Sequence, residues 1–158
     1  MLGHLTGRLL LERERFPGRV WEPACGDGSI ARYFPGCWAT DLVGRGYGQG
    51  GVDFLKTDAA VDHIVTSPPF SLAVEFALHA LRCARQKVAL YHRLAFVEGQ
   101  ERYERLHRPH PFSRLYAFVR RQSSARAGVA SEGGGHMAFA WFVWDKGQSG
   151  TKHFDWLS

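Results

Sequence analysis

Strand and helix patterns along this sequence predict an α/β fold: a mostly parallel sheet with an antiparallel hairpin at its edge. Over roughly the first two thirds of the chain, short apolar runs typical of buried strands alternate with segments whose apolar residues recur at helical spacing. Two further strand-like runs then follow one another with no helical segment between them. Alternation favours parallel pairing, whereas consecutive strands favour a hairpin. At 158 residues we expect one compact domain, residues 1–158.

The first helix is expected within residues 1–18. Leucines at positions 2, 5, 9 and 10 are interrupted by Arg8 and by the charged run 12–15. That pattern suits an amphipathic helix rather than a signal peptide, whose apolar stretch is unbroken. The sequence has no apolar run of about 20 residues, so we expect no membrane crossing.

The later elements should include six strands and three helices. We expect the strands at 19–22, 37–43, 62–66, 87–94, 114–120 and 138–144, and the helices at 29–34, 73–84 and 98–107. Two stretches are expected to lack regular structure because they are rich in glycine or in small residues. They are the loop 44–51 and a mobile loop at 123–136.

Charge and cysteine content restrict the function classes. Twenty Lys and Arg against 15 Asp and Glu give a net charge of +5, mostly from arginine. Arginine suits phosphates and base edges, so the charge is as consistent with a nucleic-acid partner as with ordinary solubility. Cys25, Cys37 and Cys83 form no CxxC pair. We therefore expect no disulfide framework, no zinc site and a reducing, cytoplasmic location.

A glycine turn, Gly26-Asp27-Gly28, stands between an expected strand and an expected helix. Glycine lets the backbone approach a ligand closely, and the start of a helix offers unpaired N–H groups. With Ala31 the run also fits the G-x-G-x-x-A pattern of dinucleotide-binding proteins, so that alternative stays open. The turn alone is weak evidence for a nucleotide-like cofactor.

Three carboxylates strengthen the cofactor interpretation. Asp41 ends the second strand, where a carboxylate can accept from both hydroxyls of an adenosine ribose. Asp53 can accept from an adenine amine while Phe54 packs on the ring, and Glu22 is placed to meet a cationic amine. A carboxylate at Glu22 would not attract an anionic pyrophosphate, whereas it would attract a ligand with sulfonium and ammonium groups. Glu22 and Asp53, each taken singly, are equally consistent with a surface or capping role.

The most specific motif is Ser67-Pro68-Pro69-Phe70, directly after an expected strand. Ligands of open α/β sheets bind at the carboxyl ends of strands. An exocyclic amine on a base is a poor nucleophile, and the Ser67 hydroxyl and Pro68 carbonyl can accept its hydrogen bonds and free its lone pair. The prolines stiffen the turn beforehand, and Phe70 offers a face for a flipped-out base. The simpler alternative is a proline turn that ends a strand.

These motifs resemble those of S-adenosylmethionine-dependent methyltransferases that act on amino groups of DNA bases. Residues 93–96 and 140–146 also resemble small phage-type enzymes of this class, so the resemblance covers about Val20 to Lys146. It implies a seven-stranded Rossmann-like sheet with S-adenosylmethionine over the first strands. It assigns catalysis to Ser67, Pro68, Pro69 and Phe70, and the cofactor to Glu22, Pro23, Ala24, Cys25, Gly26, Gly28, Asp41, Asp53 and Phe54.

The resemblance leaves the target base open. Relatives with Thr-Ser-Pro-Pro before an aromatic residue usually methylate cytosine N4, whereas the phage-type relatives generally carry Asn in place of Ser and act on adenine N6. We slightly favour cytosine, because Ser67 is the residue nearest the chemistry. The alternatives are an enzyme acting on RNA or on a protein glutamine, and a methyltransferase-like subunit that binds nucleic acid without turnover.

Five basic residues are candidates for nucleic-acid contacts, although each taken singly is better explained as a solvated position. They are Arg93, Arg120, Arg121, Arg126 and His136. No separate target-recognition domain fits in 158 residues, so we expect a monomer or homodimer that binds DNA, or RNA, through this domain. His107 and His110 lack a fourth ligand, so no metal is expected.

Overall fold

The structure, a computed structural model, describes residues 6–120, 137–148 and 152–158. The strands are β1 (Val20–Glu22), β2 (Trp38–Ala39), β3 (Val61–Thr66), β4 (Ala84–Arg93), β5 (Arg114–Phe118), β6 (Phe139–Asp145) and β7 (His153–Leu157). The α-helices are α1 (Thr6–Arg13), α2 (Ala73–Cys83) and α3 (Gln100–Arg102), and α3 continues as a π-helical turn at Tyr103–His107. Short 3₁₀ turns occupy Ala31–Tyr33, Phe54–Lys56, Phe70–Leu72 and Leu94–Val97.

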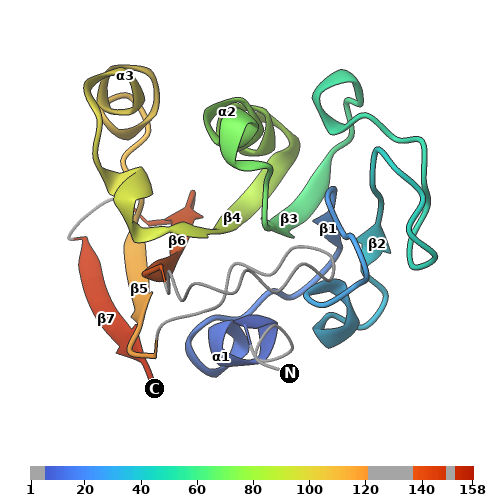
Figure 1. Cartoon of the computed structure of the whole chain (residues 1–158), viewed down its shortest axis with the longest axis horizontal. Coiled ribbons are helices and arrows are strands. Elements are labelled where there is room, and N and C mark those ends of the chain that lie inside the picture. The colour runs from blue at the N-terminus through green and yellow to red at the C-terminus, as the bar shows by residue number, and fades with distance from the viewer. Residues whose placement is uncertain (1–5, 121–136, 149–151) are drawn as a thin grey trace.

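The seven strands form one sheet in the order β2-β1-β3-β4-β6-β5-β7. Helix α1 lies on one face of the sheet, and α2 and α3 lie on the other (Figure 1). Strand β6 runs antiparallel to both of its neighbours, and the other described pairs are parallel. The expected class is therefore confirmed: a mostly parallel sheet with an antiparallel hairpin, here β5 and β6.

The order of the strands reverses at β1. The chain passes from β1 outward to β2 and then crosses back, so that β3 lies on the other side of β1. Trp21 of β1 pairs with Trp38 of β2 and with Ile64 of β3. Because the three strands are parallel, they end at the same edge, and such a reversal is where open α/β sheets bind ligands. The loops that leave β1 and β3 carry the predicted site.

Three expected elements are shorter or looser than the sequence pattern suggests. Only Trp38–Ala39 of the range 37–43 is strand, because Asp41 and the residues after it bond back onto the glycine-rich loop. The helix expected at 29–34 is a single 3₁₀ turn, since six residues before a Pro-Gly stop are too few to sustain an α-helix. The helix expected at 98–107 begins as α3 and then widens into the π-helical turn.

Strand β7 is missing from the sequence-based prediction. It pairs in parallel with β5 along its whole length, from Arg114 opposite His153 to Phe118 opposite Leu157. The hairpin of β5 and β6 consequently lies one strand inside the edge of the sheet. A five-residue strand whose two aromatic residues face solvent lacks the buried apolar pattern that marks the other strands.

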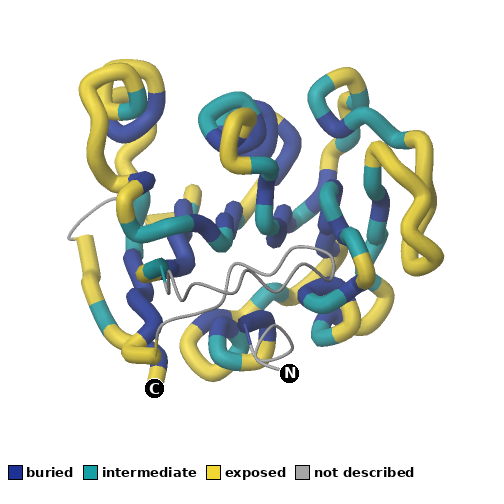
Figure 2. The backbone as a smooth tube through the Cα atoms, viewed as in Figure 1, coloured by how far each residue is buried: buried dark blue, intermediate teal, exposed yellow. Residues whose placement is uncertain are grey.

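Apolar side chains pack on both faces of the sheet. Ile64 and Phe142 belong to the core beneath α2, while Val65 and Trp141, their neighbours in sequence, face the α1 side. This alternation within one strand is the period-two geometry of a sheet covered on both faces. The central strands are accordingly buried along most of their length, whereas β7 is largely exposed (Figure 2).

A buried ionic cluster joins the segment after α1 to the sheet. The Glu14 carboxylate is 3% exposed and accepts hydrogen bonds from Arg114, from Lys87 at 2.8 Å and from the Tyr116 hydroxyl at 2.7 Å. Arg114 also bonds Asp145 at 2.9 Å. Burial by itself would raise the pKa of Glu14, but the bonds from Arg114, Lys87 and Tyr116 outweigh it and lower that pKa. The cluster holds α1 against β4, β5 and β6.

Glu14→Gln should destabilise the protein by about 3 to 5 kcal/mol at neutral pH, because Lys87 and Arg114 would keep their burial and lose their counter-charge. A carboxyl whose pKa is lowered by folding contributes stability above its unfolded value and loses it as pH falls through the folded value. Thermal unfolding should therefore show a gap between variant and wild type that narrows in acid. A gap independent of pH would contradict the ionic role. The exposed Glu104→Gln is the matched control, with little expected effect.

Candidate cofactor and active site

The carboxyl ends of three neighbouring parallel strands carry the predicted site. Glu22 is the last residue of β1 and leads into the glycine turn. Ser67 follows the last residue of β3, and Arg93 is the last residue of β4. Strand β3 lies between β1 and β4 and is parallel to both. The structure thus brings the three segments, far apart in sequence, to one edge of the sheet.

Hydrogen bonds hold the glycine turn in one conformation without the help of a following α-helix. The Gly26 N–H donates to Asp41 Oδ2 at 2.8 Å, and the Gly28 N–H donates to the Cys25 carbonyl at 2.8 Å. Gly26 and Gly28 have φ values of 54° and 79°, which favour glycine. From the outside, Arg32 donates to the Gly28 carbonyl at 2.9 Å. No sequence pattern marks Arg32 for this role.

Asp41 links the turn to the end of β2. Its Oδ2 accepts from Gly26, and its Oδ1 accepts from the Val43 N–H at 3.1 Å. Each carboxylate oxygen can accept a second hydrogen bond, and the side chain is only partly buried. Asp41 therefore retains the capacity to accept from ribose hydroxyls while it shapes the turn.

Glu22 is a buried carboxyl with an unfilled acceptor. It is 2% exposed, and its Oε2 has no hydrogen-bond partner among the described residues. Burial raises the pKa of Glu22 well above its ordinary value, and the charges of Asp27 and Asp41 raise that pKa further. A hydrogen bond from the Ala31 N–H lowers the pKa but does not offset the burial. A buried acceptor among negative charges favours a cationic donor as partner. The ammonium group of S-adenosylmethionine is such a donor, so these residues fit that cofactor.

Asp53 and Phe54 have local roles in the structure. Asp53 Oδ1 accepts from the Leu55 N–H at 3.1 Å and so caps the 3₁₀ turn Phe54–Lys56. The Phe54 ring is 2% exposed and lies edge-on against Trp21, with ring centroids 5.0 Å apart. The structure therefore places Phe54 in the core, as a support for Trp21, and leaves Asp53 partly exposed.

The glycine-rich loop 44–51 folds back onto the glycine turn. The N–H of Asp41 donates to the Gln49 carbonyl at 2.9 Å, which closes the loop. Tyr47 packs so tightly on Gly28 that any side chain at position 28 would overlap its ring. Tyr47 thus forms one wall of the turn. Sequence reasoning missed it, and the only available signal was an aromatic residue inside a run of glycines.

The tetrapeptide forms an ordered turn. Pro68 is buried, Ser67 and Pro69 are partly buried, and Phe70 is 37% exposed. The Leu72 N–H donates to the Pro69 carbonyl at 3.0 Å and starts a 3₁₀ turn. Helix α2 begins after Leu72 with no side-chain cap. Capping of the next helix therefore does not account for the polar residues of the turn.

Arg93 lies over the ring of Phe70. Its guanidinium carbon is 4.1 Å from the ring centroid, a cation–π distance. The Arg93 Nε is buried and has no hydrogen-bond partner among the residues that the structure describes. The ring of His92 stands edge-on to Phe70, with centroids 4.9 Å apart. Phe70, the last residue of the tetrapeptide, and Arg93 therefore form one stacked pair.

Of the other basic candidates for nucleic-acid contacts, only Arg120 lies within the described residues. Arg120 is exposed two residues beyond β5, which runs in the same direction as β4. It therefore lies at the same end of the sheet as Ser67. Arg121, Arg126, His136 and the loop 123–136 lie outside the described residues.

Asp58, His79 and Cys83 come together beneath the 3₁₀ turn Phe54–Lys56 in an arrangement that resembles a metal site. Arg82 donates to His79 Nδ1 at 2.7 Å, so the ring proton resides on Nε2, which donates to the Thr57 carbonyl at 3.0 Å. A nitrogen that carries a proton has no lone pair for a metal. We assign His79 to the packing of α2 against this turn.

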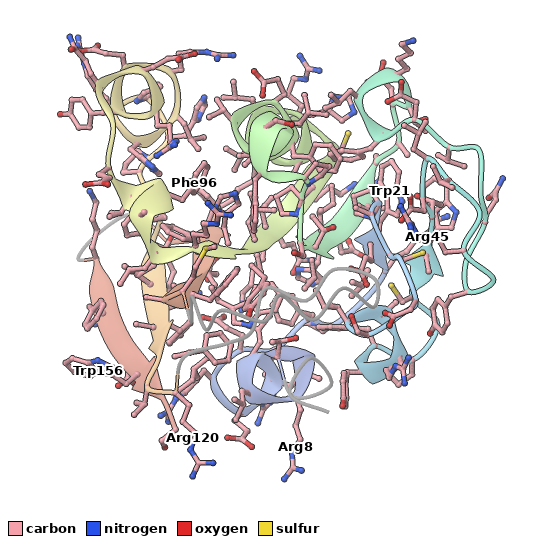
Figure 3. The ribbon with its side chains drawn as sticks, viewed as in Figure 1. Arg8, Trp21, Arg45, Phe96, Arg120 and Trp156 are labelled. Atoms are coloured by element: carbon pink, nitrogen blue, oxygen red, sulfur yellow. The ribbon has the colours of Figure 1, made fainter. Side chains whose placement is uncertain are left out.

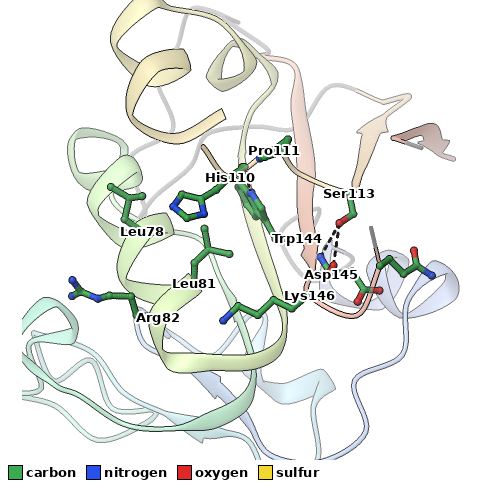
Figure 4. A pocket seen from close by; sticks show the side chains of 10 residues that line it. Leu78, Leu81, Arg82, His110, Pro111, Ser113, Trp144, Asp145 and Lys146 are labelled. Atoms are coloured by element: carbon green, nitrogen blue, oxygen red, sulfur yellow. Dashed lines mark hydrogen bonds between the residues drawn. The ribbon is translucent and has the colours of Figure 1, made fainter. Parts of the chain in front are cut away.

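A hollow of about 550 Å³ opens at the opposite end of the sheet (Figure 4). It lies where β6 ends, and β6 runs against β4, so it is remote from Ser67. Two of its polar groups are bonded within the protein. Trp144 Nε1 donates to the His110 carbonyl at 2.7 Å, and Lys146 Nζ donates to the Ala84 carbonyl at 2.6 Å. The hollow is therefore separate from the predicted site.

Solved methyltransferase structures share this fold. A methyltransferase subunit of a type I restriction-modification system from Streptococcus thermophilus matches with a TM-score of 0.63 and 12% identity, over 94% of this chain and 44% of that one. A putative class I S-adenosylmethionine-dependent methyltransferase from Listeria monocytogenes matches with 0.63 and 10%, over 99% and 64%. A putative RNA methyltransferase from Pyrococcus horikoshii matches with 0.61 and 12%, over 90% and 79%. The chain has the Rossmann-like class I methyltransferase fold.

Sequence comparison adds nothing to this: no family model matches the chain, and neither does any curated protein. The chain spans 44% and 64% of the length of the first two structures. At identities of 10–12%, the similarity to these structures concerns the fold and not the roles of individual residues. In the part of the chain that the structure describes, no helix is long and apolar enough to cross a membrane.

Glu22→Gln should weaken the binding of S-adenosylmethionine about tenfold, the order expected for one charge-assisted hydrogen bond. It should also raise the melting temperature of the ligand-free protein. A carboxyl whose pKa is raised by folding contributes stability below its unfolded value and loses it as pH rises through the folded value, and the amide avoids that loss. Calorimetric titration and thermal melts measure both effects, with exposed Glu12→Gln as control. Unchanged cofactor affinity would remove Glu22 from the site.

Gly28→Ala should destabilise the protein for two reasons, overlap with Tyr47 and a strained positive φ. Tyr47→Ala removes the overlap and leaves the strain. The loss of unfolding free energy caused by Gly28→Ala should therefore be at least about 1 kcal/mol smaller in the Tyr47→Ala background than in the wild type. A double-mutant cycle measured by denaturant unfolding would show this difference. Strictly additive costs would argue against the contact.

Proposed function

We propose that this protein transfers a methyl group from S-adenosylmethionine to the exocyclic amino group of a DNA base, with cytosine N4 slightly favoured over adenine N6. The observation that carries the proposal is the position of Ser67-Pro68-Pro69-Phe70, one strand away from the glycine turn at the reversal of a class I methyltransferase sheet. A type I restriction-modification methyltransferase subunit and a putative RNA methyltransferase share the fold, which supports a nucleic-acid substrate.

The residues around the glycine turn would hold the cofactor, which supplies an electrophilic methyl group. Glu22 pairs with its ammonium, and Asp41 accepts from its ribose hydroxyls. Asp53 accepts from the adenine amine. The backbone of the turn, from Pro23 through Ala24, Cys25 and Gly26 to Gly28, lines the site together with the Tyr47 ring. Phe54 acts indirectly, by fixing Trp21 beneath the turn.

The tetrapeptide prepares the amine for attack. The Ser67 hydroxyl and the Pro68 carbonyl accept its two N–H bonds and turn its lone pair out of the base plane. Pro69 and the 3₁₀ turn after it keep these acceptors fixed before the substrate arrives. The bound cofactor would supply its methyl group from a sulfonium and leave as a neutral thioether, and the amine, cationic once methylated, would release one proton to water. Positioning supplies most of the rate enhancement, with no covalent enzyme intermediate.

Phe70 and Arg93 hold the base itself. The base stacks on the face of Phe70 that Arg93 leaves open, and Arg93 fixes the ring from its other face. Stacking on Phe70 accepts cytosine and adenine alike. The choice between them falls to Ser67 and the shape of the turn.

RNA is the second candidate substrate, favoured by the shared fold of the putative RNA methyltransferase. The chemistry is unchanged, because RNA bases present the same amines. Mass identification of the methylated nucleoside after digestion separates the two substrates and identifies the base.

Pro68→Ala and Phe70→Ala should each lower methyl transfer about 100-fold or more, because they disturb fixed acceptors and the stacking face. Cofactor affinity should stay within about twofold in both. The assay combines labelled cofactor with DNA or RNA, and Tyr103→Ala, an exposed aromatic residue on the π-helical turn, is the control. Wild-type turnover in both variants would remove the tetrapeptide from the chemistry. Unmodified bases in both nucleic acids would overturn the proposed function.

A further inference from the structure

Strand β7 carries an exposed aromatic pair that the proposed reaction does not use. Phe154 is 51% exposed and Trp156 is 56% exposed, and their rings meet edge to face with centroids 4.7 Å apart. The next residue, Leu157, is buried and anchors the strand. Two large aromatic rings in contact on an outer strand form a surface feature that folding alone does not require.

The direction of β7 places this pair at the same end of the sheet as the tetrapeptide. Strand β7 is parallel to β5, and β5 and β4 are both antiparallel to β6. Trp156, near the end of β7, therefore lies at the same end of the sheet as Phe70 and Arg93. Strands β4, β6 and β5 separate β3 from β7, which corresponds to a distance of about 19 Å across the sheet.

Two arginines lie close to the backbone of β7. An Arg13 nitrogen donates to the Trp156 carbonyl at 3.1 Å, and Arg13 also lies 3.6 Å from Asp155. The carbonyl bond and the ion pair with Asp155 keep a half-exposed guanidinium against the backbone of β7 at Trp156. Arg120 follows Val119, whose N–H bonds to the end of β7. Figure 3 shows Trp156 at the left edge of the molecule and Arg120 below it, at the lower end.

We propose that Trp156 and Phe154, with Arg13 and Arg120, form a second contact site for the nucleic-acid strand whose target base enters at Phe70. An unpaired base stacks on Trp156, and the arginines meet its phosphates. Aromatic stacking accepts any base, so this site holds the strand without reading its sequence. A separation of about 19 Å corresponds to about six nucleotide steps at B-form rise, and to fewer in an extended strand.

This inference rests on the proposed function, and substrates of two lengths test the second contact and the function separately. A single-stranded oligonucleotide of about twelve nucleotides can reach both sites, whereas a dinucleotide with the same target base reaches only the tetrapeptide. Trp156→Ala should weaken binding of the long strand about tenfold and leave dinucleotide methylation unchanged. Trp156→Phe keeps an aromatic face and should retain most of the affinity. Tyr103→Ala is the control, since Tyr103 is equally exposed on the π-helical turn.

The outcomes distinguish the second contact from the proposed function. Equal affinity of wild type and Trp156→Ala for the long strand would overturn the contact, while a methylated dinucleotide would leave the function standing. Trp156-dependent binding without methylation of either substrate would support the contact and overturn the function. If Trp156→Ala instead converts a dimer to a monomer in sedimentation and leaves strand affinity unchanged, the pair is a self-association surface and the proposal is wrong.

Discussion

The parallel pairing of β1 with β3 is the constraint on which the candidate site depends. Strand β1 has three residues, all buried, and its register with β3 rests on Val20 opposite His63 and Trp21 opposite Ile64. Trp21 reinforces that register, because its ring stacks on Trp38 and its Nε1 donates to the Thr40 hydroxyl at 2.9 Å. A slip of one residue would turn every side chain of β1 to the other face. The glycine turn and the tetrapeptide would then no longer share an edge in the observed orientation.

Two buried carboxyls, Glu14 and Glu22, have pKa values shifted in opposite directions by their surroundings. Glu14 has cationic and hydroxyl partners that outweigh its burial, so its pKa is lowered and it stabilises the fold as an anion. Glu22 is just as buried, has an unfilled oxygen and has carboxylates as neighbours, so its pKa is raised. A protein gains nothing in stability from the second arrangement. On the proposed function, the cofactor supplies the missing positive charge.

Local patterns predicted the elements whose residues decide their own structure. Helix α2 and strands β3, β4 and β6 lie close to the expected ranges, because their apolar periodicity coincides with their burial. Strand β7 is stabilised by pairing with β5 rather than by a buried apolar pattern, so its five residues carry no signal. The candidate motifs were identifiable because each directly follows an apolar run that predicts a strand. The contacts of Phe54 with Trp21, and of Tyr47 with Gly28, arise only when distant segments meet.

On the proposed function, little in the described structure would read a nucleotide sequence. Stacking on Phe70 or Trp156 accepts any base. Arginine contacts to phosphates hold a strand regardless of its bases. Discrimination then falls to the fit of one amine between the Ser67 hydroxyl and the Pro68 carbonyl. That fit selects the base that is methylated and is indifferent to its neighbours, which favours an enzyme with low sequence specificity.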